Sequence, residues 1–171
     1  MGDLAGAEAA EREDLALGRK ILGNDHPNLA YTLNNLGWIL LEKGDWKEAE
    51  PVLRENLELR LRVFSEKNAA LVAGPNNWAR LLQAKGEYAG AERYYQQALR
   101  ISRETNGAES WRTAQILANL GLLQLDRNDY AGAERFARQA FAIRQKLGGE
   151  QNDMHDASIR QLNWSFSMPL L

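Results

Sequence analysis

The sequence contains no cysteine among its 171 residues. Disulfide bonds, thiolate metal sites and cysteine nucleophiles are therefore excluded. An excess of either charge is also missing, since 21 Lys and Arg residues stand against 23 Asp and Glu residues and leave a net charge of −2. A general nucleic-acid or anionic-membrane surface would need excess positive charge. We therefore expect neither a nucleic-acid partner nor a membrane partner.

Long apolar runs are missing as well. The stretch from Trp38 to Leu41 is among the longest, and it is far too short to cross a bilayer. The first four residues show no basic segment followed by an apolar one, as a secretory signal would. Residue 6 is glycine, whereas the myristoylation pattern needs Ser or Thr there. These absences predict a cytoplasmic protein.

Catalytic motifs are absent too. Of the two histidines, His26 falls between expected helices and directly precedes Pro27, and His155 stands close to the loop before the last expected helix. The sequence has no glycine-rich phosphate loop, no nucleophile elbow and no His-Glu-x-x-His metal motif. We therefore expect no enzymatic activity, no cofactor and no metal site.

What the sequence does contain is one motif repeated at a fixed interval. The segment Gly44–Glu50 (GDWKEAE) returns at 86–92 (GEYAGAE) and at 128–134 (NDYAGAE), and a version stands at 2–8 (GDLAGAE). The interval is 42 residues each time. A fixed period of this size indicates a repeat solenoid. We expect a single array over residues 2–169, with units 2–43, 44–85, 86–127 and 128–169.

Each unit reads as two helices. One helix begins at the motif, where Asp45 can cap it with Glu48 three residues on, and runs to about Phe64. The other runs from about 28 to 43. Its expected inner line is Leu33, Leu36, Gly37 and Leu40, at helical intervals.

Small residues recur at matching phases, which lets facing helices approach closely. Gly37 is matched by Ala79 and Gly121, and Ala49 by Ala7, Ala91 and Ala133. Each short turn between helices begins with Gly44 or its equivalent, a residue type that terminates helices. The pattern predicts an all-α fold of about eight antiparallel helices.

Two stretches depart from the pattern. Pro75 replaces an inner-line leucine and lacks the amide that would bond the Leu71 carbonyl. A proline inside a helix costs about 3 kcal/mol or more, so we expect the helix from about Asn68 to kink or restart near Gly74. A last helix is expected from about 153 to 168, where Leu162 is in phase with Leu36. Its tail is apolar, although terminal repeats usually present a polar outer face.

The motifs together resemble the tetratricopeptide repeat pattern. The resemblance rests on Leu33, Leu36-Gly37, Leu40, Trp46 and Ala49, and on their counterparts in the later units. The period of 42 rather than 34, with Leu22–Pro27 between helices, is similar to kinesin light chain. The resemblance implies a right-handed superhelix that acts as a protein-protein interaction module. The expected ligand is a short extended peptide, held in a concave groove. The alternative is a structural or self-associating helical-repeat segment of a larger protein.

The resemblance also implies which helices line the groove, namely the helix at 28–43 and its equivalents. The expected groove residues are Tyr31, Asn34, Asn35 and Trp38, then Asn76, Asn77 and Arg80, and finally Gln115, Asn119 and Leu122. Side-chain amides that recur at 35, 77 and 119 offer a donor and an acceptor each to a peptide backbone. Arg80 is expected to pair with an acidic ligand residue, and Trp38 to take an apolar one.

Alternatives remain open at several of these positions. The recurrent asparagines could instead bond between neighbouring helices, and Trp38 could be a groove anchor or a wedge against the next repeat. Trp78 and Trp111 are expected in the core. The charges from Arg54 to Arg62 are expected on a solvated helix face with i,i+4 pairs. Self-association would use the apolar end of the chain. That end comprises Trp164, Phe166, Met168, Leu170 and Leu171.

Overall fold

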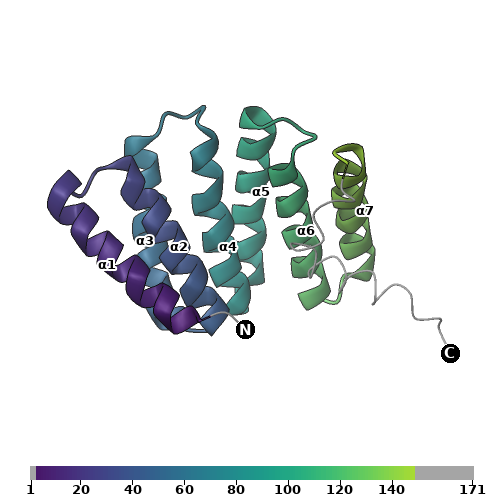
Figure 1. Ribbon diagram of the computed structural model, residues 1–171. Helices are drawn as coiled ribbons and strands as arrows, with labels where there is room; N and C mark the ends of the chain where they lie inside the picture. Colours follow the sequence, from purple (N-terminus) through teal and green to yellow (C-terminus); the bar gives the residue numbers. More distant parts are fainter. Residues whose placement is uncertain (1–2, 149–171) are drawn as a thin grey trace. The chain divides into compact units, whose positions relative to one another are not determined.

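The computed structural model describes residues 3–148, and every regular element in that range is a helix (Figure 1). The elements are α1 (Leu4–Leu22), α2 (Pro27–Lys43), α3 (Trp46–Val63), the short 3₁₀ helix η1 (Ala69–Val72), α4 (Ala73–Ala84), α5 (Tyr88–Thr105), α6 (Trp111–Asp126) and α7 (Tyr130–Lys146). The all-α prediction is therefore confirmed. The helix expected at 153–168 lies outside the described residues.

The chain divides after Ile101 into two compact units, and α5 crosses the division. In unit 1, α2 lies at the centre and packs against α1, α3 and α4. In unit 2, α6 packs along α7. A single array of all four sequence units stays a prediction.

The close approach expected between α2 and α3 is present. Leu33, Leu36 and Leu40 are buried along α2. A Cβ atom added at Gly37 would lie 2.3 Å from Cδ2 of Leu53 on α3, which is too close for any contact between two carbon atoms. A larger residue at position 37 would therefore displace the buried Leu53 side chain, so the glycine makes room for that leucine.

The short turns need a residue with a left-handed backbone. Gly44, Gly86 and Asn128 occupy the same place in three successive repeats, with φ of 73°, 78° and 60°. Glycine adopts this conformation without steric cost, and asparagine is one of the few other residues that tolerate it. The residue that follows caps the next helix: Asp45 accepts a hydrogen bond from the Glu48 amide at 3.3 Å.

The predicted restart near Gly74 is confirmed. The 3₁₀ helix η1 ends at Val72, and α4 begins at Ala73. Pro75 therefore lies in the first turn of α4, where backbone amides have no partner within the helix, and a missing amide costs nothing there. The chain thus places Pro75 in the part of a helix where a proline costs least.

Arg60 contradicts the expectation of a solvated charged face on α3. It is buried, and its guanidinium group donates to the Ala30 carbonyl at 3.0 Å and to Oδ1 of Asn56 at 3.0 Å. It also donates to the Ala70 carbonyl in η1. The long side chain reaches backbone acceptors on two other elements, and these compensate for its burial. Arg54, by contrast, is exposed and pairs with Glu50 as expected.

Unit 2 has its own core, in which Leu117 and Leu120 of α6 are buried, as are Ala133 and Phe136 of α7. Thr113 anchors the start of α6: its hydroxyl donates to the Gly107 carbonyl at 2.9 Å. These contacts fix the loop before α6 against the first turn of that helix.

Ion pairs recur with the repeat in unit 1. Lys43, the last residue of α2, pairs with Glu8 of α1. One period later, Lys85 pairs with Glu50 of α3 at 3.0 Å. These hydrogen bonds lower the pKa of both carboxyl groups and raise the pKa of both lysines. The first pair therefore links α1 to α2, and the second links α3 to the end of α4.

Candidate functional site

One face of α2 carries two exposed aromatic side chains. Tyr31 and Trp38 are 52% and 44% exposed, and Asn35 is exposed between them. The three residues follow one another at steps of four and three, so they lie on the same side of the helix. We call Tyr31, Asn35 and Trp38 the α2 face. All three were predicted as ligand contacts.

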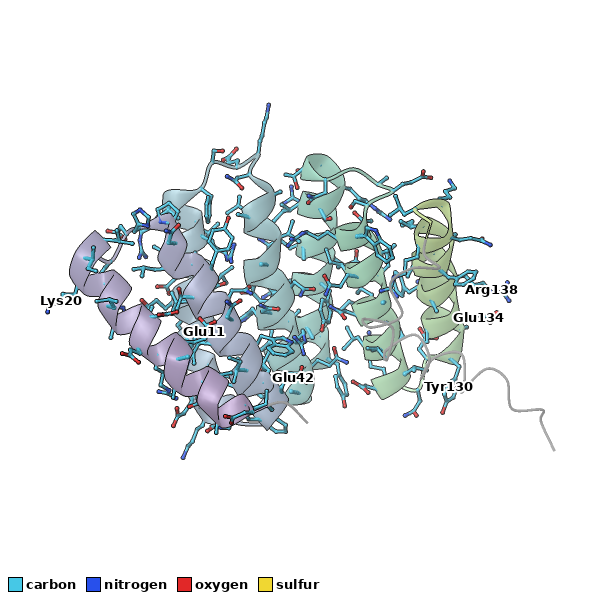
Figure 2. The ribbon with its side chains drawn as sticks, viewed as in Figure 1. Glu11, Lys20, Glu42, Tyr130, Glu134 and Arg138 are labelled. Atoms are coloured by element: carbon cyan, nitrogen blue, oxygen red, sulfur yellow. The ribbon has the colours of Figure 1, made fainter. Side chains whose placement is uncertain are left out.

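Carboxylates border the α2 face on two sides. Asn35 donates its side-chain amide to Oε1 of Glu11 on α1 at 3.0 Å. At the other border, Arg80 of α4 donates to Oε1 of Glu42 at 2.7 Å. Figure 2 labels Glu11 on α1 and Glu42 near the end of α2. Arg80 is thus neutralised within unit 1, and an acidic ligand residue would have to displace Glu42 to reach it.

The second asparagine of the predicted row has a different environment. Asn77 is buried, and it donates its side-chain amide to Oδ1 of Asn34 at 2.9 Å. Asn76 donates in turn to Oδ1 of Asn77 at 3.2 Å. Of the two interpretations of the asparagines, this bond between α2 and α4 supports the one in which they hold neighbouring helices together. The sequence shows that these residues recur, but not which of them lies beside another helix.

The remaining predicted residues lie in unit 2. Gln115 is exposed on α6, while Asn119 and Leu122 are half-buried there. They follow one another at steps of four and three, as the α2 face does. Their participation in a shared groove stays a prediction.

Two tryptophans were expected in the core, and only one packs against it. Trp78 is partly buried, and its ring meets that of Tyr94 edge-on at 6.4 Å. Trp111 is 42% exposed, so that prediction is wrong. It is the first residue of α6, where no preceding turn covers it. The Arg144 guanidinium lies 5.8 Å from its ring centre.

Within residues 3–148, no group of three or more His, Asp or Glu side chains is arranged to hold a metal ion. In the same range, no helix combines the length and apolar character needed to cross a bilayer. The described residues thus form helical hairpins, and α2 carries two exposed aromatic side chains on one face.

The chain belongs to the tetratricopeptide repeat family, whose model matches residues 1–62 and 69–146. Repeats of this family generally mediate protein-protein interactions or serve as scaffolds, and the proteins are typically non-enzymatic. Between the two matched ranges, residues 63–68 comprise the last residue of α3 and the connection to η1. The resemblance noted from the sequence is therefore confirmed.

Solved structures show the same fold. The crystal structure of BtubC (BKLC) from P. vanneervenii has a TM-score of 0.73 at 23% identity, covering 98% of this chain and 68% of that one. A putative kinesin light chain of Podosopora anserina, with nearly identical TPR-like repeats, has a TM-score of 0.70 at 16% identity, covering 98% and 90%. No curated protein matches the sequence.

Proposed function

We propose that this chain is a protein-interaction module that binds a short extended peptide across the α2 face. The observation that carries the proposal is the pair of exposed aromatic rings, Tyr31 and Trp38, on one side of a helix whose other side is buried. Tyr and Trp are the residues most enriched among binding hot spots, because they bury a large area at little entropic cost.

The backbone of the ligand would meet Asn35. Its side-chain amide already donates to Glu11, and an amide oxygen accepts up to two hydrogen bonds. A backbone amide of an extended peptide is a suitable donor to that oxygen. Because backbone groups are common to all peptides, this contact would hold the ligand without selecting its sequence.

Selectivity would come from the apolar side chain held between the rings and from the charge around it. Glu11 and Glu42 border the α2 face, and Arg80 offsets only one of these carboxylates. The Arg60 guanidinium lies 5.5 Å from the centre of the Tyr31 ring, but it is buried. The charges exposed at the border are therefore mainly carboxylates, and they favour a neutral or basic residue beside the apolar anchor. This revises the acidic ligand expected from the sequence, because the Arg80–Glu42 pair had not been foreseen.

The proposal is tested by selecting twelve-residue peptides from a random displayed library on the wild-type protein and measuring their affinity for single variants. Affinity should be modest, on the order of micromolar, because a disordered peptide loses entropy on binding. Trp38→Ala should weaken binding by about tenfold or more, which corresponds to about 1.4 kcal/mol.

The matched control is Trp46→Ala, since Trp46 is also 44% exposed but begins α3, away from the α2 face. It should leave affinity unchanged. Circular dichroism must show that both variants keep the wild-type helix content. If folded Trp38→Ala binds the selected peptides as tightly as Trp46→Ala does, the α2 face is not the binding site.

A further inference from the structure

One side of α1 is apolar and open. Ala7, Ala10, Leu17 and Ile21 lie on a common side of the helix, and Leu17 and Ile21 are 53% and 68% exposed. The opposite side of α1 carries buried Leu15 and packs on α2. We call the four exposed residues the α1 stripe.

The repeat shows what normally covers such a stripe. One period later, the same positions on α3 are Ala49, Val52, Leu59 and Val63. Ala49 and Leu59 are 0% exposed, because α2 packs over them. In the α2–α3 hairpin, therefore, α2 buries the side of α3 that corresponds to the α1 stripe. The α1 stripe lacks that partner among the described residues.

The chain contains a further segment with the pattern of α2. Residues 153–168 lie beyond α7, and Ile159, Leu162 and Phe166 stand three periods after Leu33, Leu36 and Leu40. The sequence thus repeats the inner line of α2 at its C-terminal end.

The polar residues of the two segments also match. In the α2–α3 hairpin, Gly37 lies against the Leu53 side chain. Asn163 has the phase of Gly37, and Glu11 has the phase of Leu53. Where the hairpin has Gly37 against Leu53, the two equivalent positions therefore have an amide, Asn163, and a carboxylate, Glu11. An amide donates to a carboxylate, which accepts several hydrogen bonds and can keep the one from Asn35.

We infer that this protein self-associates head to tail, with residues 153–168 of one copy docking on the α1 stripe of a second copy. The contact would complete in trans the hairpin that α2 and α3 form within one copy. Such an interface is heterologous, because the two copies contribute different surfaces, and it propagates into a ring or an open filament. The α1 stripe shares no residue with the α2 face, and Glu11 is the one side chain that would contact both Asn35 and the docked segment.

Sedimentation velocity of the full chain over a range of concentrations tests the association. The average mass should rise with concentration and pass beyond that of a dimer. Leu17→Glu should hold the protein at the monomer mass, because it places a charge in the centre of the stripe. The matched control is Leu61→Glu on α3, since Leu61 is 63% exposed and lies outside the stripe. The control should associate like the wild type.

A mixing experiment tests the head-to-tail arrangement. Leu162→Glu should also be monomeric by itself. Mixed at equal concentrations, Leu17→Glu and Leu162→Glu should form a dimer that grows no further, because only one intact stripe meets one intact tail. A wild-type protein that remains monomeric overturns the inference. So does a Leu162→Glu protein that still self-associates, since it would indicate contact between two α1 helices.

The polar pair gives a finer test that disturbs no apolar contact. Asn163→Asp should weaken association roughly tenfold at neutral pH, because it opposes two carboxylates. Adding Glu11→Gln should restore most of the loss by removing one of the charges. An Asn163→Asp protein that associates as strongly as the wild type would show that the two segments do not meet in this register.

Discussion

Helices α2 and α4 occupy the same place in successive repeats, yet their surroundings differ. Asn35 of α2 is exposed, while Asn77, one period later, is buried and bonded to Asn34. The difference arises because α4 has a helix of its own kind, α2, on its N-terminal side, whereas among the described residues α2 has no such neighbour. Equivalent positions in two repeats therefore point their side chains to the same side of the helix. Whether that side is buried depends on the helix packed next to it.

The two helices also begin differently, and this leads to the largest expected effect. Position 33 of α2 is leucine, and its equivalent in α4 is Pro75. Leu33→Pro would place a proline in the interior of α2, where it removes a hydrogen bond and crowds a carbonyl, at about 3 kcal/mol or more. This cost adds to the loss of the buried leucine side chain.

Leu33→Ala separates the two contributions, since it removes only the side chain and should cost about 2–5 kcal/mol. Urea denaturation of both variants gives the comparison. Equal destabilisation of the two would mean that α2 tolerates a break as α4 does, and that the position of the proline is unimportant.

A smaller effect is expected for the two asparagines. Asn77→Ala removes the bond to Asn34 and leaves a half-buried amide without its partner, at about 1–3 kcal/mol. Asn35→Ala acts at an exposed position and should change the free energy of unfolding by less than about 0.5 kcal/mol. Thermal unfolding of both variants distinguishes them. Similar melting temperatures would show that the Asn34–Asn77 bond contributes little to packing.

The smallest effect concerns the lysines at the C-terminal ends of α2 and α4, Lys43 and Lys85. Glu8 and Glu50 have pKa values lowered from 4.5 by hydrogen bonds from Lys43 and Lys85. A lowered folded-state pKa contributes stability above the unfolded value, and this is lost as the pH falls through the folded value. Stability should therefore decline below about pH 4.5 partly through these pairs.

Lys43→Met should reduce that decline slightly, as measured by the urea midpoint at pH 7 and pH 3. Lys20→Met provides the control, because Lys20 is exposed at the end of α1 (Figure 2). If Lys20→Met reduces the loss of stability between pH 7 and pH 3 as much as Lys43→Met does, the effect comes from net charge and not from the ion pairs.

The helices could be read from the sequence because their determinants are local and repeat. Leu36 and Gly37 mark the buried side of α2, and Asp45 marks the start of α3, by spacing alone. Arg60 could not be placed in this way. A charged residue at an inner phase is buried only if acceptors lie within its reach, and those acceptors are backbone carbonyls of α2 and η1.

The candidate site was predicted less completely, and for a related reason. Tyr31 and Trp38 were found because side chains on one face of a helix follow from its period. The partners of Asn77 and Arg80 depend on the register between separate helices, which the period of a single helix does not specify. Trp111 was misplaced because its burial would need a preceding turn that α6 does not have.

The left-handed residues at 44, 86 and 128 have a practical consequence for engineering the chain. The turns that contain them span two or three residues, and those at 44 and 128 include an aspartate that caps the next helix. The connections from α3 to η1 and from α5 to α6 are five residues long. Added sequence should therefore be tolerated in the longer connections, for example beside Glu66, where the chain is exposed. A fluorescent protein or affinity tag inserted there would report on the folded molecule, whereas one inserted after Asp45 would separate α3 from its cap.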